Sequence, residues 1–141
     1  MIMLLLGLLG IASLQPAAAG MSGTWVADHR GTTYIRIELS AVDGTLAGKM
    51  GTGTVHFDKN GDVDEAAAPA SMTMTPLLEV TLDGTSLSFA THEGNDTDHF
   101  RLTVVGADQA ELTFILTEEL LEELKDEGIP VPKPFRLRRL R

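Results

Sequence analysis

The sequence predicts an all-β domain of antiparallel strands that follow one another in chain order. Short segments alternate apolar and polar residues, as strands with one buried and one exposed face do. Asp-Gly pairs at 43–44 and 83–84 are typical of two-residue hairpin turns. The sequence lacks the strand-helix-strand spacing of a parallel sheet. We therefore predict eight antiparallel strands in an up-and-down barrel, which leaves no exposed edge; a sandwich of two four-stranded sheets is the alternative.

The first 19 residues stand apart because they carry no charged side chain. Their apolar run at 2–14 is shorter than the ~20 residues that span a membrane, and the alanines at 17–19 suit a signal peptidase site. We predict a signal peptide at residues 1–19 and a secreted or periplasmic domain at residues 20–141, with no membrane span after cleavage. An uncleaved signal anchor is the alternative, since no basic residue precedes the apolar run. The chain has no cysteine, which excludes disulfides.

The first two predicted strands span residues 24–29 and 33–42. Alternation in the second strand gives a core-facing set and a solvent-facing set: Ile35, Ile37, Leu39 and Ala41 face the core, and Tyr34, Arg36, Glu38 and Ser40 face outward. A type I′ turn at Asp43-Gly44 fixes the register of the third strand. This register pairs Ile37 with Met50 and makes Glu38 and Lys49 an opposite-charge pair on the outer face.

The later strands follow the same rules. The turn at Asp83-Gly84 predicts three cross-strand pairs: Leu82 with Thr85, Val80 with Leu87, and Leu78 with Phe89. Segments 100–104 and 112–116 alternate on either side of Gly106. Matching their apolar faces requires a five-residue loop at 105–109 or a β-bulge. Residues 135–140 form the last predicted strand.

Two segments interrupt the alternation. Residues 58–76 are rich in Gly, Asp, Ala and Pro and are predicted to form a long connection. Residues 117–128 predict a short acidic helix before the last strand, with Thr117 as its N-cap and Gly128 at its C-terminal stop. A narrow apolar stripe on this helix should lie on the barrel, either as a simple bridge between strands or as a gating lid; the stripe is Leu120, Leu121 and Leu124.

Two short motifs mark the ends of the predicted barrel. Gly23-Thr24-Trp25 opens the first strand, and Phe135, Leu137 and Arg139 alternate along the last. With the meander between them, these motifs resemble the lipocalin-like barrels of the calycin superfamily, and more closely short secreted bacterial domains of unknown function that begin with Gly-Thr-Trp. The resemblance covers most of the chain after the leader. It implies that Trp25 packs under Arg139, a cation–π contact worth about 1–2 kcal/mol that closes the base of the barrel. Departures from a typical lipocalin are the shorter chain and the acidic helix.

An eight-stranded barrel is just wide enough to be filled by its own side chains or to hold one small ligand. The small residue Gly48 leaves room inside, whereas the many leucines fill it, so both states stay open. A small apolar molecule would contact an inward-facing set: Ile37, Leu39, Met50, Leu78, Val80, Phe89, Phe100, Leu102 and Phe114. In the alternative, a filled-core barrel binds a protein or the cell envelope through its outer surface, with Tyr34, Arg36, Arg136 and Arg138 as contacts.

The polar segment 58–64 has oxygen ligands at alternate positions, as a calcium loop does. The alignment fails because Val63 occupies the position of the turn glycine and Pro69 that of the bidentate glutamate. We therefore predict an Asn-Gly hairpin or an acidic loop there.

A second polar segment, 92–99, contains side chains that zinc accepts, but it lacks the spacing of a zinc motif. We predict no metal site and no cofactor. His92, Asp98 and His99 are kept as weak metal candidates, which would support a metal-dependent hydrolase as a third and less favoured function.

The sequence contains no catalytic motif. Its four histidines are scattered, its paired glutamates are neighbours on one helix, and it has no phosphate loop or dinucleotide fingerprint. The net charge of −9 argues against nucleic acid as a partner, since phosphate binding requires a basic surface. We expect a secreted or periplasmic binding module and no enzyme.

Overall fold

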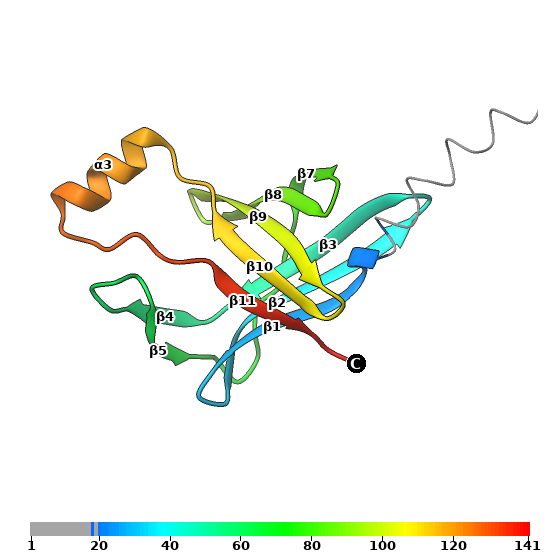
Figure 1. Cartoon of the computed structure of the whole chain (residues 1–141), viewed down its shortest axis with the longest axis horizontal. Coiled ribbons are helices and arrows are strands. Elements are labelled where there is room, and N and C mark those ends of the chain that lie inside the picture. The colour runs from blue at the N-terminus through cyan, green and yellow to red at the C-terminus, as the bar shows by residue number, and fades with distance from the viewer. Residues whose placement is uncertain (1–17, 19) are drawn as a thin grey trace, which may run out of the picture.

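The structure, a computed structural model, describes Ala18 and residues 20–141 (Figure 1). The predicted signal peptide, residues 1–19, lies outside the described residues apart from Ala18, which is buried. Within the described part, a nine-stranded antiparallel sheet curls into a nearly closed barrel, accompanied by a two-stranded hairpin and the helix α3. The elements are β1 (Gly23–His29), β2 (Thr32–Val42), β3 (Thr45–Thr52), β4 (Thr54–Phe57), β5 (Val63–Ala67), β6 (Thr75–Pro76), β7 (Leu78–Asp83), β8 (Ser86–Glu93), β9 (Asp96–Gly106), β10 (Gln109–Phe114), α3 (Glu118–Asp126) and β11 (Phe135–Arg139).

The barrel closes through the segment that joins its two edge strands. The order around the sheet is β6-β3-β2-β1-β11-β10-β9-β8-β7, and Leu77 alone separates β6 from β7 in the sequence. β6 pairs with β3, the Leu77 amide donates to the Gly48 carbonyl at 2.9 Å, and β7 pairs with β8. The main sheet therefore has nine strands and not the eight predicted, because the end of the expected long connection forms β6.

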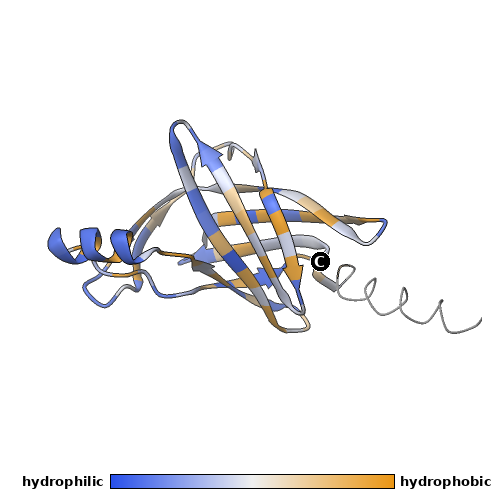
Figure 2. Cartoon of the chain, turned by 90° about the horizontal axis from the view of Figure 1, so that it is seen from above, coloured by the Kyte–Doolittle hydropathy of each residue, from blue (hydrophilic) through white to orange (hydrophobic). Residues whose placement is uncertain are grey.

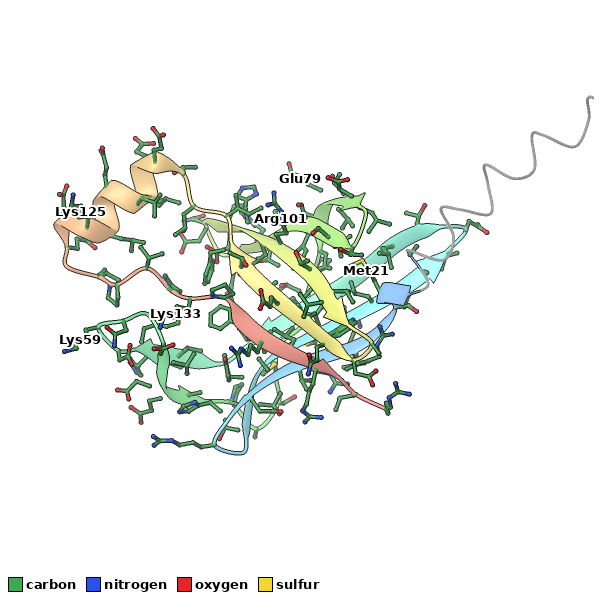
Figure 3. All side chains as sticks on the ribbon, in the orientation of Figure 1. Met21, Lys59, Glu79, Arg101, Lys125 and Lys133 are labelled. Carbon is green, nitrogen blue, oxygen red and sulfur yellow. The ribbon has the colours of Figure 1, made fainter. Side chains whose placement is uncertain are left out.

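Part of that expected connection also folds as a hairpin. β4 pairs with β5, and the turn between them contains Asn60 and Gly61, which has a φ of 84°. The Asp58 carboxylate accepts hydrogen bonds from the Asn60 and Asp62 amides at 2.8 and 3.1 Å. Lys133, close to this hairpin in Figure 3, forms a 2.9 Å ion pair with Asp62. The prediction of an Asn-Gly hairpin is thus confirmed, whereas the prediction of a strand-free connection is wrong.

The predicted turn at Asp43-Gly44 is confirmed. Asp43 and Gly44 have φ values of 54° and 78°, as a type I′ turn requires, and Glu38 pairs with Lys49 as predicted. The turn between β9 and β10 adopts the bulged form of the two alternatives, because Gln109 pairs with Gly106 and the register then shifts.

The predicted turn at Asp83-Gly84 is wrong by one residue. Asp83 remains in β7 and pairs with Ser86, so that Gly84 and Thr85 form the turn. Further along β7 the register shifts again, and Leu78 pairs with Ala90 and not with Phe89. Since neighbouring residues of a strand face opposite sides, these shifts leave Leu78 40 % exposed and bury Leu77.

Helix α3 has the predicted ends but not the predicted packing. The Thr117 hydroxyl accepts a hydrogen bond from the Leu120 amide at 3.2 Å, and Gly128 has a φ of 70°. The helix projects from one end of the barrel as a hydrophilic segment (Figure 2), and none of its residues is buried. Leu120 and Leu121 are 45 % and 38 % exposed, so the expectation that this stripe lies on the barrel is wrong.

Gly48 leaves no room inside the barrel, contrary to the prediction. A Cβ atom added there would lie 2.0 Å from the Glu38 carbonyl oxygen, a backbone atom that cannot move aside alone. Gly48→Ala should therefore lower the free energy of unfolding by about 2 kcal/mol or more, measured by chemical denaturation. Gly106→Ala is the matched control, since its Cβ would meet only the Gln109 side chain at 3.6 Å. Equal stability of the two variants would contradict the close approach of β2 and β3.

Candidate functional site

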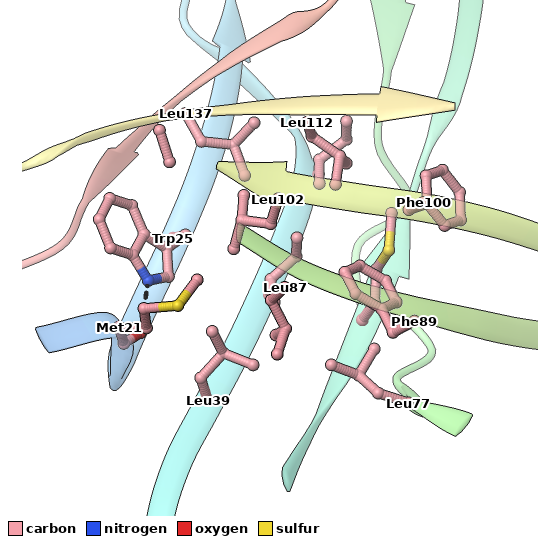
Figure 4. Packing of buried hydrophobic residues seen from close by; sticks show 14 of the residues in the cluster. Met21, Trp25, Leu39, Leu77, Leu87, Phe89, Phe100, Leu102, Leu112 and Leu137 are labelled. Carbon is pink, nitrogen blue, oxygen red and sulfur yellow. Dashed lines mark hydrogen bonds between the residues drawn. The ribbon is translucent and has the colours of Figure 1, made fainter. Parts of the chain in front are cut away.

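One end of the barrel is sealed around Trp25. The indole nitrogen donates to the Met21 carbonyl at 2.9 Å (Figure 4), and the side chain is fully buried. Trp25 pairs with Arg139 across β1 and β11, and the guanidinium carbon lies 4.4 Å from the centroid of the Trp25 ring. Arg139 also donates to the carbonyls of Ser22 and Gly20. The contact that the resemblance implies is present, and it holds the residues before β1 across this end.

Above this seal the barrel is filled by packed side chains. Leu87, Leu102 and Leu112 converge at the centre of the core with no exposed surface (Figure 4). Four residues predicted to contact a ligand belong to this packed layer and line no hollow at the open end: Ile37, Leu39, Phe89 and Leu102. The side chains of this central layer therefore pack against one another and do not line the opening.

The opposite end of the barrel is hollow. A cavity of about 170 Å³ opens there between the ends of the barrel strands and the β4–β5 hairpin. Its lining is mainly apolar and aromatic: Ile35, Met50, Thr52, Gly53, Val55, Phe57, Asp98, Phe100, Phe114 and Phe135. Helix α3 leaves the barrel from this same end, after β10 (Figure 1). We call this cavity the mouth.

Four phenylalanine rings form one connected cluster in the mouth. Phe114 lies between Phe100 and Phe135, with ring centroids 4.8 and 5.8 Å away. Phe57 reaches Phe135 from the hairpin at 6.0 Å. Such spacings are typical of stabilising aromatic pairs. Phe57 and Phe114 are partly exposed at the opening, whereas Phe100 and Phe135 are buried behind them, with 4 % and 5 % of their surface exposed.

A smaller hollow of about 40 Å³ adjoins the mouth and shares Met50, Thr52, Asp98 and Phe100 with it. The rest of its lining is mostly polar: Thr73, Thr75, Thr91 and Glu93. Asp98 thus lies at the boundary between the aromatic cavity and this smaller hollow, whose hydroxyl and carboxylate groups form a polar rim. Neither lining includes a lysine, arginine or histidine.

Asp98 is exposed at the edge of the mouth, and its ionised form is nevertheless disfavoured in the folded protein. Partial burial raises its pKa above the ordinary value of 3.8, and the charges of Asp96 and Glu93 raise it further, against an opposing effect of His99. Within the described residues, Asp98 accepts no hydrogen bond and forms no ion pair that would offset this.

The raised pKa of Asp98 predicts a pH-dependent stability. Because the folded state binds this proton more tightly than the unfolded state, the ionised carboxylate lowers stability above the folded pKa. That loss is relieved as the pH falls from the folded pKa toward 3.8. Asp98→Asn should therefore stabilise the protein at pH 7, and its advantage should shrink near pH 4. Urea denaturation at the two pH values measures this, and a destabilised variant at pH 7 would contradict it.

The structure brings together only part of the predicted ligand set. Met50, Phe100 and Phe114 line the mouth, whereas Leu78 faces outward and Val80 packs against the core. Ile35 was predicted to face the core but not to contact a ligand, and Asp98 was considered only as a metal ligand. The lining residues that the sequence analysis missed are Thr52, Gly53, Val55, Phe57 and Phe135. Alternation could have identified Phe135, because it shares an inward face with Leu137. It could also have identified Val55 and Phe57, which alternate in the strand just before the Asn-Gly turn.

The three weak metal candidates do not converge. Thr91 pairs with Asp98 on the face that Phe100 occupies, whereas His92 pairs with Thr97 and His99 with Ala90 on the other face. His92 Nδ1 lies 3.0 Å from the Thr97 hydroxyl. In the described part of the chain, no three His, Cys, Asp or Glu side chains are grouped so that they could hold a metal ion.

The outer surface holds a further hollow, of about 420 Å³, over β1, β10 and β11. Arg138 donates to Asp28 at 2.7 Å beside it, and Arg136 and Glu111 add further charges. Burial alone would raise the pKa of Asp28, but hydrogen bonds from Thr33 and Arg138 and the Arg138 charge outweigh it and lower the pKa. We call this hollow the outer groove.

Tyr34, predicted to face outward, is in fact buried, with 4 % of its surface exposed. A bulge between β1 and β2 is the reason: Ala27 pairs with Ile35 and Asp28 with Thr33, so Tyr34 has no partner in β1. Its ring packs edge-on against Phe135 at 6.0 Å. Burial and the neighbouring Asp28 charge raise the pKa of Tyr34, which keeps the phenol neutral.

No helix among the described residues is long and apolar enough to cross a membrane. No protein-family model, curated protein or solved structure matches the chain.

Proposed function

We propose that the chain is a secreted or periplasmic, lipocalin-like binding module that takes a small apolar ligand into the mouth of its barrel. The observation that carries this proposal is an aromatic hollow of about 170 Å³ at one end of a barrel whose other end is sealed by Trp25 and Arg139. A barrel that is closed at one end and has an apolar cavity at the other can take up a ligand from one side. No catalysis is proposed, and no cofactor, metal or nucleic acid is needed for this role.

The size of the mouth limits the ligand. Cavities that enclose drug-sized ligands measure about 300–1,000 Å³, so this cavity fits a smaller molecule or one arm of a larger one. Displacing water from the exposed parts of Phe57 and Phe114 supplies the driving force, since burial of apolar surface contributes about 25 cal/mol per Å². Because Phe57 belongs to the β4–β5 hairpin, a movement of that hairpin would change the size of the opening.

Two measurements test this function. Native mass spectrometry of the protein, purified gently from its secretion route, should show a discrete extra mass that disappears on mild denaturation. The emptied protein should then bind a neutral fluorescent naphthylamine with saturation, and toluene should displace it. A bare polypeptide mass together with the absence of saturable uptake would reject the proposal and leave the filled-core alternative.

The outer groove supports a second candidate function, a surface module that binds a protein or the cell envelope. Arg136 and Arg138 carry its positive charge, although Arg138 is paired with Asp28. Arg36 is outside the lining, pairs with the lining residue Val26 across β1 and β2, and lies 3.5 Å from Glu38. Sedimentation with anionic lipid vesicles tests the envelope version. Binding that Arg136→Ser weakens would favour it, and equal sedimentation with neutral vesicles would count against it.

A further inference from the structure

We infer that the mouth selects a small organic cation with an apolar body, whose charged group sits beside Asp98 while its apolar part rests on the phenylalanine rings. A protonated amine that carries an aromatic or branched aliphatic group is the chemical class that fits. This inference rests on the proposed function, because it names the kind of ligand that the same cavity would take.

The position of Asp98 is the first argument. Asp98 lines both the aromatic cavity and the adjoining polar hollow, two residues before Phe100 on the same inner face of β9. It has no hydrogen-bond or ion-pair partner among the described residues. Because Asp98 is exposed, a cation that enters the cavity can reach its carboxylate, and the direction of its pKa shows that the negative charges of Asp96 and Glu93 there outweigh the effect of His99.

The aromatic rings are the second argument. The face of a phenylalanine ring carries negative electrostatic potential, so it attracts a cation within about 6 Å. Phe114, the partly exposed ring of this set, lines the same cavity as Asp98, with the buried Phe100 and Phe135 in contact with it, so that one ligand could meet both kinds of group. A neutral apolar molecule would use the rings and leave the carboxylate without a partner.

The rim supplies the third argument. Glu93 adds a second carboxylate to the polar hollow, and threonine hydroxyls there can accept hydrogen bonds from an ammonium group. Since no basic side chain lines either hollow, nothing in the lining would pair with an anionic ligand. The net charge of −9 attracts cations to the surface as well. The charges of the rim and of the whole chain therefore both favour a positively charged ligand.

Three ligands of similar shape test this inference: 2-phenylethylammonium, propylbenzene and 3-phenylpropanoate. Their affinities are measured at pH 7 by displacement of the neutral fluorescent naphthylamine. We expect the ammonium to bind about tenfold more tightly than propylbenzene, from the cation–π and ion-pair contacts. The carboxylate should bind most weakly. Raising the salt concentration should weaken the binding of the ammonium and not that of the other two ligands.

Two isosteric variants locate the selectivity. Asp98→Asn should remove most of the preference for the ammonium over propylbenzene, and Glu93→Gln should remove a smaller part of that preference. Asp43→Asn is the matched control, because it removes the same charge at the exposed β2–β3 turn, where asparagine also tolerates positive φ. It should leave all three affinities unchanged.

The outcomes separate this inference from the proposed function. If propylbenzene binds as tightly as the ammonium, the inference is overturned and the apolar binding function stands. An ammonium preference that survives Asp98→Asn, or that Asp43→Asn reduces equally, also overturns it, because the selectivity would then come from general charge attraction. If none of the three ligands displaces the naphthylamine, or the naphthylamine itself does not bind, the proposed function fails and the inference fails with it.

Discussion

Trp25→Ala should lower the free energy of unfolding by about 3–5 kcal/mol, the usual cost of removing a large buried aromatic side chain. Trp25 has no exposed surface, donates a hydrogen bond to Met21 and lies under the Arg139 guanidinium. All three contributions disappear together. In a thermal melt the midpoint should fall by more than about 10 °C.

Two further variants separate these contributions. Trp25→Phe retains most of the ring and should cost much less than the alanine variant. Arg139→Gln keeps the indole and removes the charge above it, which should cost about 1–2 kcal/mol in chemical denaturation. An unchanged melting midpoint for Trp25→Ala would show that the sealed end contributes little to the fold.

Phe114→Ala should weaken the binding of a neutral apolar ligand at least about tenfold, because Phe114 joins the other rings of the mouth. Its ring contacts both Phe100 and Phe135, and its side chain is only half buried. Removing it breaks the aromatic surface at its centre. Displacement of the fluorescent naphthylamine by toluene measures the loss.

Phe89→Ala is the matched control for this prediction. Phe89 also stacks on Phe100, at 5.6 Å, but it is 2 % exposed and does not line the mouth. Phe89→Ala should lower the free energy of unfolding by about 3–5 kcal/mol, which is more than Phe114→Ala should. It should change ligand affinity much less than Phe114→Ala does. The mouth would be the wrong site if Phe89→Ala weakened binding more than Phe114→Ala did in folded protein.

The antiparallel all-β class and most strands were predictable because the signals that specify them are local. At Asp43-Gly44 both turn residues adopt positive φ, which fixed the register of β2 and β3 in advance. At Asp83-Gly84 the same pair of residues is used differently, since Asp83 stays in β7 and only Gly84 has positive φ. The dipeptide alone does not distinguish these two arrangements.

The prediction of the helix was limited in the same way, because only its local features could be read from the sequence. The caps at Thr117 and Gly128 depend on neighbouring residues and were predicted correctly. Whether Leu120 and Leu121 pack on the barrel depends on distant surfaces, and a periodic stripe carries no information about them. The bulge that buries Tyr34 is likewise a property of two paired strands and is invisible in one strand alone.

The mouth could be predicted only in part. Alternation identifies residues that face the interior, and Met50, Phe100 and Phe114 were found in this way. It does not tell which inward-facing residues are packed and which leave space. Phe57 enters from the β4–β5 hairpin, outside the main sheet, so its contribution depends on how two sheets meet.

The central claim is that the mouth binds a small apolar ligand, and the methionine methyl groups test it most directly. Met50 lines the mouth, whereas Met21 is buried at the sealed end. In protein labelled with ¹³C at the methionine methyls, titration with propylbenzene should shift the Met50 signal with saturation and leave the Met21 signal in place; Met50→Leu assigns the first signal. A Met50 signal that does not move, or an equal shift at Met21, would contradict the proposal that the mouth is the binding site.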